Sequence, residues 1–258
     1  MYFLDPTHLP QQTPKRNVSL VPSQTELLYD LGLEEETAGI TKFCIHPDTW
    51  FRSKTRIGGT KTVHIDKVRA LQPDLIIANK EENVQEQVIA LLDIAPVWKS
   101  HIPTLADALH MIRSIGALTD RSIQAAAIAD KIEQDFAALK ANKPVNTLYL
   151  IWRQPWMSVG HDTFIHDMMR RTGLNNVLSD LSRYPEVDVD LLTSKKPELV
   201  LLSSEPYPFK EQHIAELQQW LPDATMLLVD GEMFSWYGSR LLQAPDYFRR
   251  LLRTISHR

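Results

Sequence analysis

The 258-residue sequence contains a single cysteine, Cys44, so it cannot form an internal disulfide. Glycine is scarce at 9 residues, which disfavours a loop-rich or phosphate-cradling protein. Positive charge is not in excess, because 28 Lys and Arg face 32 Asp and Glu, and the net charge of −4 argues against a nucleic-acid-binding surface. No run of about 18 uncharged apolar residues predicts a membrane span. The 43% of apolar residues is enough for a substantial core, which excludes disordered and fibrous architectures.

Familiar catalytic motifs are also missing. The sequence contains no G-x-G-x-x-G, Walker lysine loop, G-x-S-x-G or H-E-x-x-H. Residues 58–62, GGTKT, lack the leading glycine and the helix signal of a phosphate loop, and we interpret them as a turn at a cleft edge. His161 and His166 are five residues apart and fall on different helix faces, which favours capping or surface roles over chelation. We therefore predict no catalytic and no metal-binding residue.

Cys44 and His46 are two residues apart and would share one side of an extended segment. Metal binding or nucleophilic chemistry would need a third and a fourth partner, and none lies nearby in the sequence. We expect Cys44 to be a small residue packed behind a loop, and His46, which precedes a proline, to line a cleft.

The first residues do not read as an export signal. Residues 1–15 carry Pro6, Pro10 and Pro14 and lack an apolar stretch of the length that a signal core needs. We interpret residues 1–16 as an N-terminal extension, and this reading alone predicts a cytoplasmic chain.

Short apolar runs alternate with helical patterns in two parts of the chain, as in buried parallel strands joined by crossover helices. The first part predicts an α/β lobe over 17–103 and the second an α/β lobe over 143–258. The predicted strands are 18–21, 38–41, 75–78 and 96–98 in the first lobe, and 147–151, 199–202 and 226–229 in the second. In the second lobe, helical patterns cover 164–171 and 211–220.

Residues 104–142 lack strand-like runs and are predicted to be linking helices. A start near Thr119 or Asp120 predicts one helix over 121–140, about 30 Å long, which could connect the two lobes. The alternative is a helix that packs within a single lobe. Near the other end of the first lobe, Ser23 and Glu26 have the spacing of a capping box that opens a helix ending at Gly32.

A weak internal repeat suggests that the two lobes are related. Asp66 lies seven residues before Pro73, and Asp190 lies seven residues before Pro197. In both places an acid precedes a short helix, the proline ends it, and a buried strand follows. The alternative is chance similarity. If the lobes are related, Asp66 and Asp190 occupy matching surface positions.

Aromatic residues gather beside the predicted strand ends of the second lobe. Ligands of open parallel sheets bind past the carboxyl ends of the strands. Flat rings there could stack on a planar ligand, while cations meet its acidic groups. Any single ring could instead be a core or loop anchor. The aromatic segments are 152–156, 184–185, 205–209 and 234–237, and the cations considered are Lys61, Lys80, Arg153 and Arg240.

Three segments carry a resemblance to a known family: VSLVPSQTELLYDLG at 18–32, GGTKTVHIDKVRALQPDLIIANKEEN at 58–83 and DGEMFSWYGSR at 230–240. Over 17–255 the chain resembles the substrate-binding proteins of cobalamin and iron-siderophore ABC importers. The resemblance implies two Rossmann-like α/β lobes with central parallel sheets, joined by one long backbone helix, with the ligand in a cleft between the lobes.

The resemblance also implies that an acid on each lobe docks onto arginines of a membrane permease, and the matching positions are Asp66 and Asp190. The family's usual residue there is the longer glutamate. Cobalamin-binding members line the cleft with tryptophans at positions that fall near Thr60, Asn79 and Tyr184, so two of three aromatic platforms are missing here. Family cleft residues near the last strand map loosely onto Gly231, Glu232 and Trp236.

We therefore predict a non-enzymatic, monomeric receptor for a metal chelate (a corrinoid, haem or ferric siderophore), with no cofactor of its own and no nucleic-acid partner. The resemblance places it in the periplasm, working with an ABC permease. The alternative is a cytoplasmic relative that acts as an enzyme or chaperone on a tetrapyrrole, with His46, Cys44 and His161 near its cleft. The predicted ligand contacts are Ser23, Phe43, His46, Thr60, Lys61, Asn79, Lys80, Trp156, His161, Tyr184, Tyr207 and Trp236.

Overall fold

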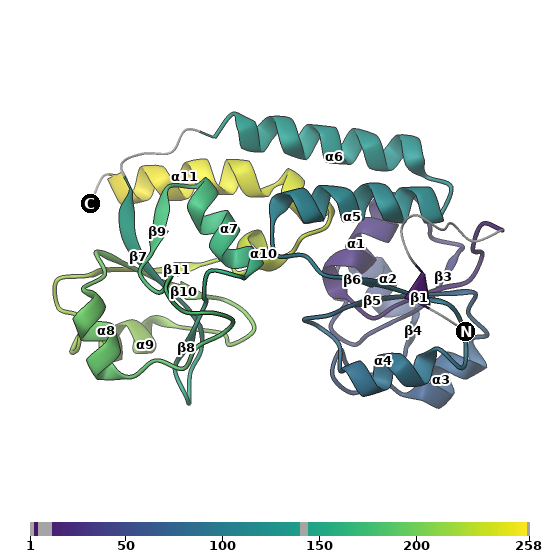
Figure 1. Cartoon of the computed structure of the whole chain (residues 1–258), viewed down its shortest axis with the longest axis horizontal. Helices are drawn as coiled ribbons and strands as arrows, with labels where there is room; N and C mark the ends of the chain where they lie inside the picture. Colours follow the sequence, from purple (N-terminus) through teal and green to yellow (C-terminus); the bar gives the residue numbers. More distant parts are fainter. Residues whose placement is uncertain (1–2, 5–11, 140–143, 257–258) are drawn as a thin grey trace. The chain divides into compact units, whose positions relative to one another are not determined.

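The computed structural model describes residues 3–4, 12–139 and 144–256, which form two α/β units (Figure 1). Unit 1 comprises Met1–Ile102, Ala106–Glu133 and Tyr237–Arg240. Unit 2 comprises Pro103–Leu105, Gln134–Trp236 and Leu241–Arg258. Within the described ranges, no helix is both long and apolar enough to cross a bilayer.

Unit 1 is built on a six-stranded parallel sheet with the order β1-β6-β5-β2-β3-β4. Four of its strands confirm the buried runs predicted from the sequence. The remaining two, β1 and β4, have two residues each, too few to show a pattern, and β1 lies within the segment interpreted as an N-terminal extension. The strands are β1 (Phe3–Leu4), β2 (Asn17–Ser19), β3 (Thr37–Ile40), β4 (Thr55–Arg56), β5 (Leu75–Asn79) and β6 (Val97–Ser100).

The first helix of unit 1, α1 (Pro22–Asp30), begins differently from the prediction. Its N-cap is Val21, with no side-chain cap, and Pro22 occupies the first turn. Proline presets the backbone angle for a helix start and needs no partner for an N–H. The predicted capping box is therefore wrong, and Ser23 lies buried inside the helix. The other short helices of the unit are α2 (Asp48–Ser53), α3 (Ile65–Ala70) and α4 (Gln85–Leu91).

Unit 2 is built on a five-stranded sheet with the order β11-β10-β7-β8, in which β9 also pairs with β7. Strands β7, β10 and β11 confirm the three strands predicted from apolar runs, and they pair in parallel. Strand β9 is also parallel to β7, whereas β8 is antiparallel to it. Sequence patterns did not predict β8 or β9 because both are short. The strands are β7 (Val145–Trp152), β8 (Met157–Ser158), β9 (Leu174–Asn176), β10 (Leu199–Ser203) and β11 (Thr225–Val229).

Two helices of unit 2 contribute Leu192 and Leu217 to a core cluster that also includes Leu148 and Leu202. The helices of the unit are α7 (Phe164–Arg171), α8 (Val189–Lys195), α9 (Glu211–Leu217), α10 (Glu232–Ser235) and α11 (Ala244–Ser256), and a 3₁₀ turn covers Ser239–Leu242. Helix α7 confirms the helix predicted over 164–171. Helix α9 lies within the predicted range 211–220 but ends earlier, at Leu217.

Two long helices, α5 (Leu105–Leu118) and α6 (Ser122–Ala137), occupy the predicted linking segment. The helix expected over 121–140 is thus 16 residues long, about 24 Å, and Lys140 lies outside the described residues. The boundary between the units falls inside α6, between Glu133 and Gln134, so this helix carries the chain from one unit to the other. Two parallel-sheet α/β lobes joined by a backbone helix are therefore confirmed.

The internal repeat seen in the sequence has a structural counterpart. Helix α3 leads through Pro73 into β5, and α8 leads through Pro197 into β10. Asp66 and Asp190 are each the second residue of their helix, and both are exposed. The repeat continues through α4 and β6 in unit 1 and through α9 and β11 in unit 2.

A buried carboxylate anchors the start of α5 within unit 2. Asp167 accepts hydrogen bonds from the backbone N–H of Leu105 at 2.8 Å, from Arg171 Nε at 2.7 Å and from Arg170 Nη2 at 2.8 Å. Its side chain is only 5% exposed. Burial alone would raise the pKa of Asp167, but these three donors outweigh burial and hold the pKa below its ordinary value.

We expect Asp167→Asn to lower the free energy of unfolding at pH 7 by about 2 kcal/mol, because two guanidinium groups and a backbone N–H lose a charged acceptor. Since the folded pKa lies below the unfolded value of about 3.9, this contribution is complete above about pH 5 and fades as the pH falls through the folded pKa. Urea unfolding at pH 7 and pH 3 checks both points. The exposed Asp180→Asn is the matched control, and an equal loss in both variants would contradict the role of Asp167.

Candidate ligand-binding site

The carboxyl ends of parallel strands lie at one edge of a sheet, and the predicted contacts of unit 1 all follow such ends. Ser23 comes after β2, Phe43 and His46 after β3, and Thr60 and Lys61 after β4. Asn79 is the last residue of β5, and Lys80 follows it. Topology therefore brings these seven predicted residues to the same edge of one sheet.

Burial separates these residues into two groups. Ser23, Thr60 and Asn79 are buried, so they can shape the edge but offer little surface to a ligand. Phe43 is 50% exposed, with the Lys42 ammonium 5.0 Å from its ring centre. Lys61 and Lys80 are exposed too. The side chains available for ligand contact at this edge therefore include an aromatic ring and several cations.

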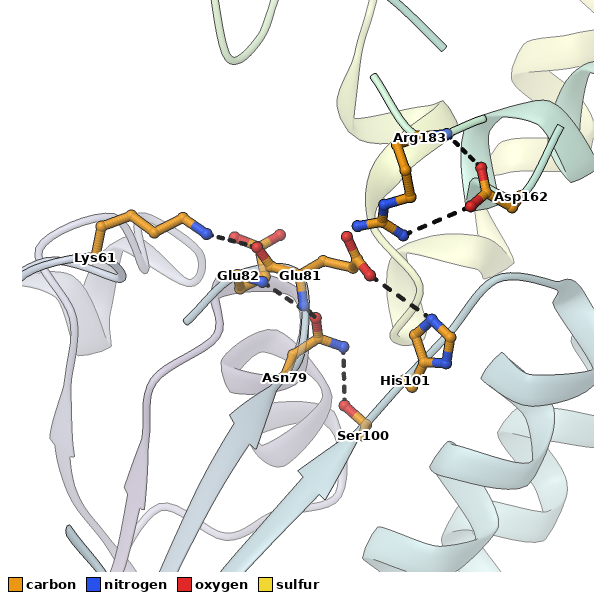
Figure 2. Close-up of polar contacts among 8 residues, drawn as sticks. All are labelled: Lys61, Asn79, Glu81, Glu82, Ser100, His101, Asp162 and Arg183. Carbon is orange, nitrogen blue, oxygen red and sulfur yellow. Dashed lines mark hydrogen bonds and ion pairs between the residues drawn. The ribbon is translucent and has the colours of Figure 1, made fainter. Parts of the chain in front are cut away.

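Asn79 organises the loop that follows β5 (Figure 2). Its Nδ2 donates to Ser100 Oγ at 3.0 Å, and its Oδ1 accepts from the backbone N–H groups of Glu81 at 2.7 Å and Glu82 at 3.2 Å. Its own N–H donates to Asn83 Oδ1 at 2.8 Å. The resemblance described above predicts a tryptophan near position 79. This chain instead has Asn79, a buried amide that positions the loop.

Sequence analysis missed the two acids of this loop. The ammonium of Lys61 donates to the carbonyl oxygen of Glu81 at 2.5 Å, and the Glu81 carboxylate lies 3.6 Å from His101 Nε2 (Figure 2). Burial raises the pKa of Glu82, although Lys61 acts in the opposite direction. Both acids lie in the segment KEEN, directly after a buried strand, which is the sequence signal for them.

The turn at 58–62 forms as predicted. Gly58 pairs with Val63 in an antiparallel bridge, and the N–H of Gly59 donates to the carbonyl of Thr62 at 2.9 Å. Gly58 has φ of +111°, a conformation that side chains rarely adopt. This turn places Thr60 and Lys61 after β4.

Cys44 is fully buried, as expected, and its sulfur lies 3.1 Å from the hydroxyls of both Thr25 and Thr41. Burial raises the pKa of the Cys44 thiol, so the protonated form dominates at neutral pH. His46, two residues further along the chain, is partly buried. Among the residues that the structure describes, no cluster of three or more His, Cys, Asp or Glu could hold a metal ion.

In unit 2 the aromatic residues follow the ends of three parallel strands, but most of them pack on each other. Trp156 stacks on Phe209, with ring centres 5.7 Å apart and planes within 8°. Tyr207 contacts His213 through its hydroxyl at 3.2 Å and packs on Phe209. The most exposed ring of this group is Trp152, at 39%, which meets Tyr207 edge to face.

Trp236 follows β11 and is buried at 6% exposure. Its Nε1 donates to Glu205 Oε1 at 3.0 Å, and the Ser235 hydroxyl donates to the same oxygen at 2.5 Å. Trp236 is therefore a buried packing residue, whereas Trp156 packs on Phe209 and remains partly exposed. Ligand contact by either residue stays a prediction.

His161 and Tyr184 belong to two neighbouring segments of unit 2. The N–H of His161 donates to the carbonyl of Leu181 at 2.9 Å, and His161 itself is exposed. The Arg183 guanidinium lies 5.5 Å from the Tyr184 ring centre. The N–H of Arg183 donates to Asp162 Oδ1 at 2.5 Å (Figure 2), and this bond lowers the pKa of Asp162.

Two cations expected to meet a ligand are engaged inside the protein. Arg240 forms a two-pronged ion pair with Glu26, at 3.0 and 2.7 Å, within unit 1. Gly238 permits this approach, because a Cβ there would lie 2.3 Å from the carbonyl oxygen of Ser23. Arg153 forms a similar pair with Glu216, at 3.0 and 3.1 Å. Both partner acids, Glu26 and Glu216, are distant in sequence from their arginines, so sequence patterns do not reveal these ion pairs.

Two parallel-sheet α/β units that share a backbone helix, with aromatic and polar loops after their strands, are the architecture of a two-lobe binding protein. Residues 18–220 match the model of the periplasmic binding protein family. Because the match covers more than half of the chain, this protein belongs to that family.

Similar proteins agree with this assignment. A vitamin B12-binding protein of Yersinia pestis is 26% identical over 261 residues, which covers 96% of this chain and 89% of the relative. The periplasmic vitamin B12 binding protein BtuF of Vibrio cholerae has the same fold, with a TM-score of 0.79 and 20% identity over 95% of this chain and 99% of that chain. The periplasmic heme binding protein HutB of Vibrio cholerae matches with a TM-score of 0.79 and 20% identity over 92% and 98%.

We expect the Cys44 thiol to react only slowly with a disulfide reagent in the native protein at pH 7.5, because it is buried and its pKa is raised. Reaction with Ellman's reagent should be slow without denaturant and stoichiometric once guanidinium chloride has unfolded the chain. Fast reaction of the folded protein would show that the thiol is accessible.

Proposed function

We propose that this protein binds a metal chelate of the corrinoid, haem or ferric-siderophore class without transforming it, and delivers it in the periplasm to an ABC importer. One observation carries the proposal: in a member of the periplasmic binding protein family, exposed side chains lie at the carboxyl ends of parallel strands, namely Phe43, Lys61 and Lys80 in unit 1 and Trp152 in unit 2. Similar proteins are named for vitamin B12 and heme binding.

The chemistry of unit 1 supports a large ligand that carries acidic groups. Lys61 and Lys80 are exposed at the carboxyl edge, where ammonium groups can meet carboxylates or phosphates. Phe43 adds a half-exposed ring to the same edge. Such a combination of apolar contact and a few charges is typical of small-molecule sites.

Unit 2 supports the same ligand class through Trp152 and Tyr207. The two rings meet at 5.7 Å, and Tyr207 is held in place by its contacts with Phe209 and His213. A ring that is already positioned loses little conformational freedom when a ligand binds. We assign Trp152 as the ring that contacts the ligand, in place of Trp156 and Trp236.

The alternative of an enzyme acting on a tetrapyrrole receives less support from the residues that motivated it. Cys44 is buried, and the raised pKa of its thiol removes the thiolate that a nucleophile needs. His161 belongs to unit 2, whereas Cys44 and His46 belong to unit 1.

Isothermal titration with cyanocobalamin, cobinamide, haemin and a ferric hydroxamate siderophore tests the proposed function. We expect one of these to bind with Kd of about 1 μM or tighter. Phe43→Ala and Trp152→Ala should each weaken that binding by about 1 to 3 kcal/mol, because each removes an aromatic contact. A matched control is Ile123→Ala, which removes an 84% exposed side chain of α6.

Two outcomes would contradict these expectations. If none of the four chelates binds more tightly than about 1 mM, a metal-chelate ligand is excluded. If a chelate binds but neither substitution affects it more than Ile123→Ala does, these two rings are not part of the site.

We further propose that Asp66 and Asp190 contact arginines of the permease. Each is the second residue of a short exposed helix that precedes a proline and a buried strand, so the repeat gives each unit one equivalent acid. An exposed carboxylate of this kind pairs with a guanidinium of a partner.

Charge reversal of both residues, Asp66→Lys with Asp190→Lys, should leave chelate binding unchanged and reduce cellular uptake of the bound chelate at least ten-fold. Uptake of the radiolabelled chelate in cells that lack the native protein measures this effect. The control is Asp180→Lys with Asp48→Lys, which reverses two other exposed acids. Equal uptake by both double variants would show that Asp66 and Asp190 do not engage a permease.

A further inference from the structure

The internal repeat points to an unfilled strand position in unit 2. In unit 1 the strand after α4, β6, is paired on its outer side by β1 in parallel. The equivalent strand in unit 2 is β11, which follows α9 and pairs with β10 on its inner side. Within the described ranges, no strand pairs with the outer edge of β11.

The outward-facing backbone groups of β11 can be assigned from its inner hydrogen bonds. Thr225 N–H donates to the carbonyl of Glu198, and the carbonyl of Val229 accepts from Ser204 N–H, both at 2.9 Å. Since backbone groups alternate in direction along a parallel strand, the N–H and C=O groups of Met226 and Leu228 point to the outer edge. This edge offers two donors and two acceptors to an added strand.

The strand itself lacks the features that usually protect an edge. Its sequence, TMLLV, contains no charge, proline or bulge, although natural edge strands are normally protected by such devices or by a covering segment. The Leu228 side chain is 41% exposed. An uncharged edge of five residues is therefore ready to pair with another segment.

A groove beside this edge provides room for side chains of an added segment. It has a volume of about 580 Å³ and lies between α9 and β11, within the range of about 300 to 1,000 Å³ that bound ligands occupy. Its lining combines apolar and polar groups: Glu211, Ile214, Gln218 and the run 224–228.

Charge around the edge indicates the chemistry of the occupant. Between Lys210, the N-cap residue of α9, and Arg240, which pairs with Glu26, the sequence contains five acids and no Lys or Arg. Of these acids, Glu216 pairs with Arg153, whereas Glu211 lines the groove. Asp223 and Asp230 stand just before and just after β11. A basic segment complements this acidic surround.

The same acids disfavour a second copy of this chain as the occupant. Two β11 strands paired antiparallel about Leu227 would place Asp223 of one copy opposite Gly231 of the other, which directly follows Asp230. Each end of the pair would then hold one Asp223 and one Asp230 with no Lys or Arg between them, and their carboxylates would repel each other.

We propose that the outer edge of β11 binds an extended segment of a partner protein, in which apolar residues are flanked by Lys or Arg. The segment adds a strand to the sheet through the backbone of Met226 and Leu228, in the way that β1 adds to β6, and its flanking cations meet Asp223 and Glu211. Main-chain pairing supplies affinity in this mode, and the side chains supply selectivity. This inference does not depend on the identity of the chelate.

Fluorescence anisotropy with two labelled peptides tests the proposal on the full chain. The probes share a central Val-Leu-Val and carry two Lys or two Glu on each side. We expect the Lys-flanked peptide to bind at least ten-fold more tightly than the Glu-flanked one and to weaken as salt increases. Hydrogen exchange should slow at the amides of Met226 and Leu228 when it binds.

Three variants define the site. Leu228→Lys places a cation on the edge and should weaken the Lys-flanked peptide at least ten-fold, whereas Ile123→Lys, an exposed substitution on α6, should have no effect. Asp223→Lys should reduce the preference for the Lys-flanked peptide. Circular dichroism before titration shows that each variant is folded.

The proposal is overturned if both peptides bind equally, if neither binds below about 1 mM, or if Leu228→Lys has no more effect than Ile123→Lys. Sedimentation adds one more decisive outcome. A dimer of the unmodified chain that Leu228→Lys dissociates would show that a second copy, and not a basic partner segment, occupies the edge.

Discussion

The direction of parallel strands is the constraint on which the candidate site depends. When neighbouring strands run the same way, the segments after them emerge at one edge, however far apart they lie in the sequence. Phe43, Lys61 and Lys80 reach the edge of the unit 1 sheet from three different strands. In unit 2 the same rule gathers the segments after β7, β10 and β11. The loops can therefore vary while the sheets keep them in place.

Buried polar groups hold these loops in defined positions. Asn79 links the end of β5 to Ser100 and to the backbone of the following loop, and Glu205 accepts from both Ser235 and Trp236. A buried polar group without a partner is costly, so each satisfied network favours one loop conformation. Buried residues therefore position the carboxyl edge of each sheet, and exposed residues at that edge are available to a ligand.

Several predicted features were confirmed because their signal is local. Buried strands such as β5 and β10 are continuous apolar runs, and the repeat of acid, helix, proline and strand could be read directly from the spacing. The capping box failed because α1 begins at Pro22 with Val21 as its N-cap, two residues before the predicted N-cap Ser23. Strands of two residues, such as β1 and β8, carry too little pattern to be recognised, since their pairing partner defines them.

The sequence by itself determined the α/β class, the positions of the long strands along the chain and the presence of two α/β halves, because hydrophobic periodicity depends only on neighbours along the chain. Tertiary structure decided which polar and aromatic residues are available. Glu26 pairs with the candidate cation Arg240, and Phe209 covers one face of Trp156, which remains partly exposed. Exposure depends on partners that are distant in sequence, so only the folded chain distinguishes the half-exposed Trp152 from the buried Trp236.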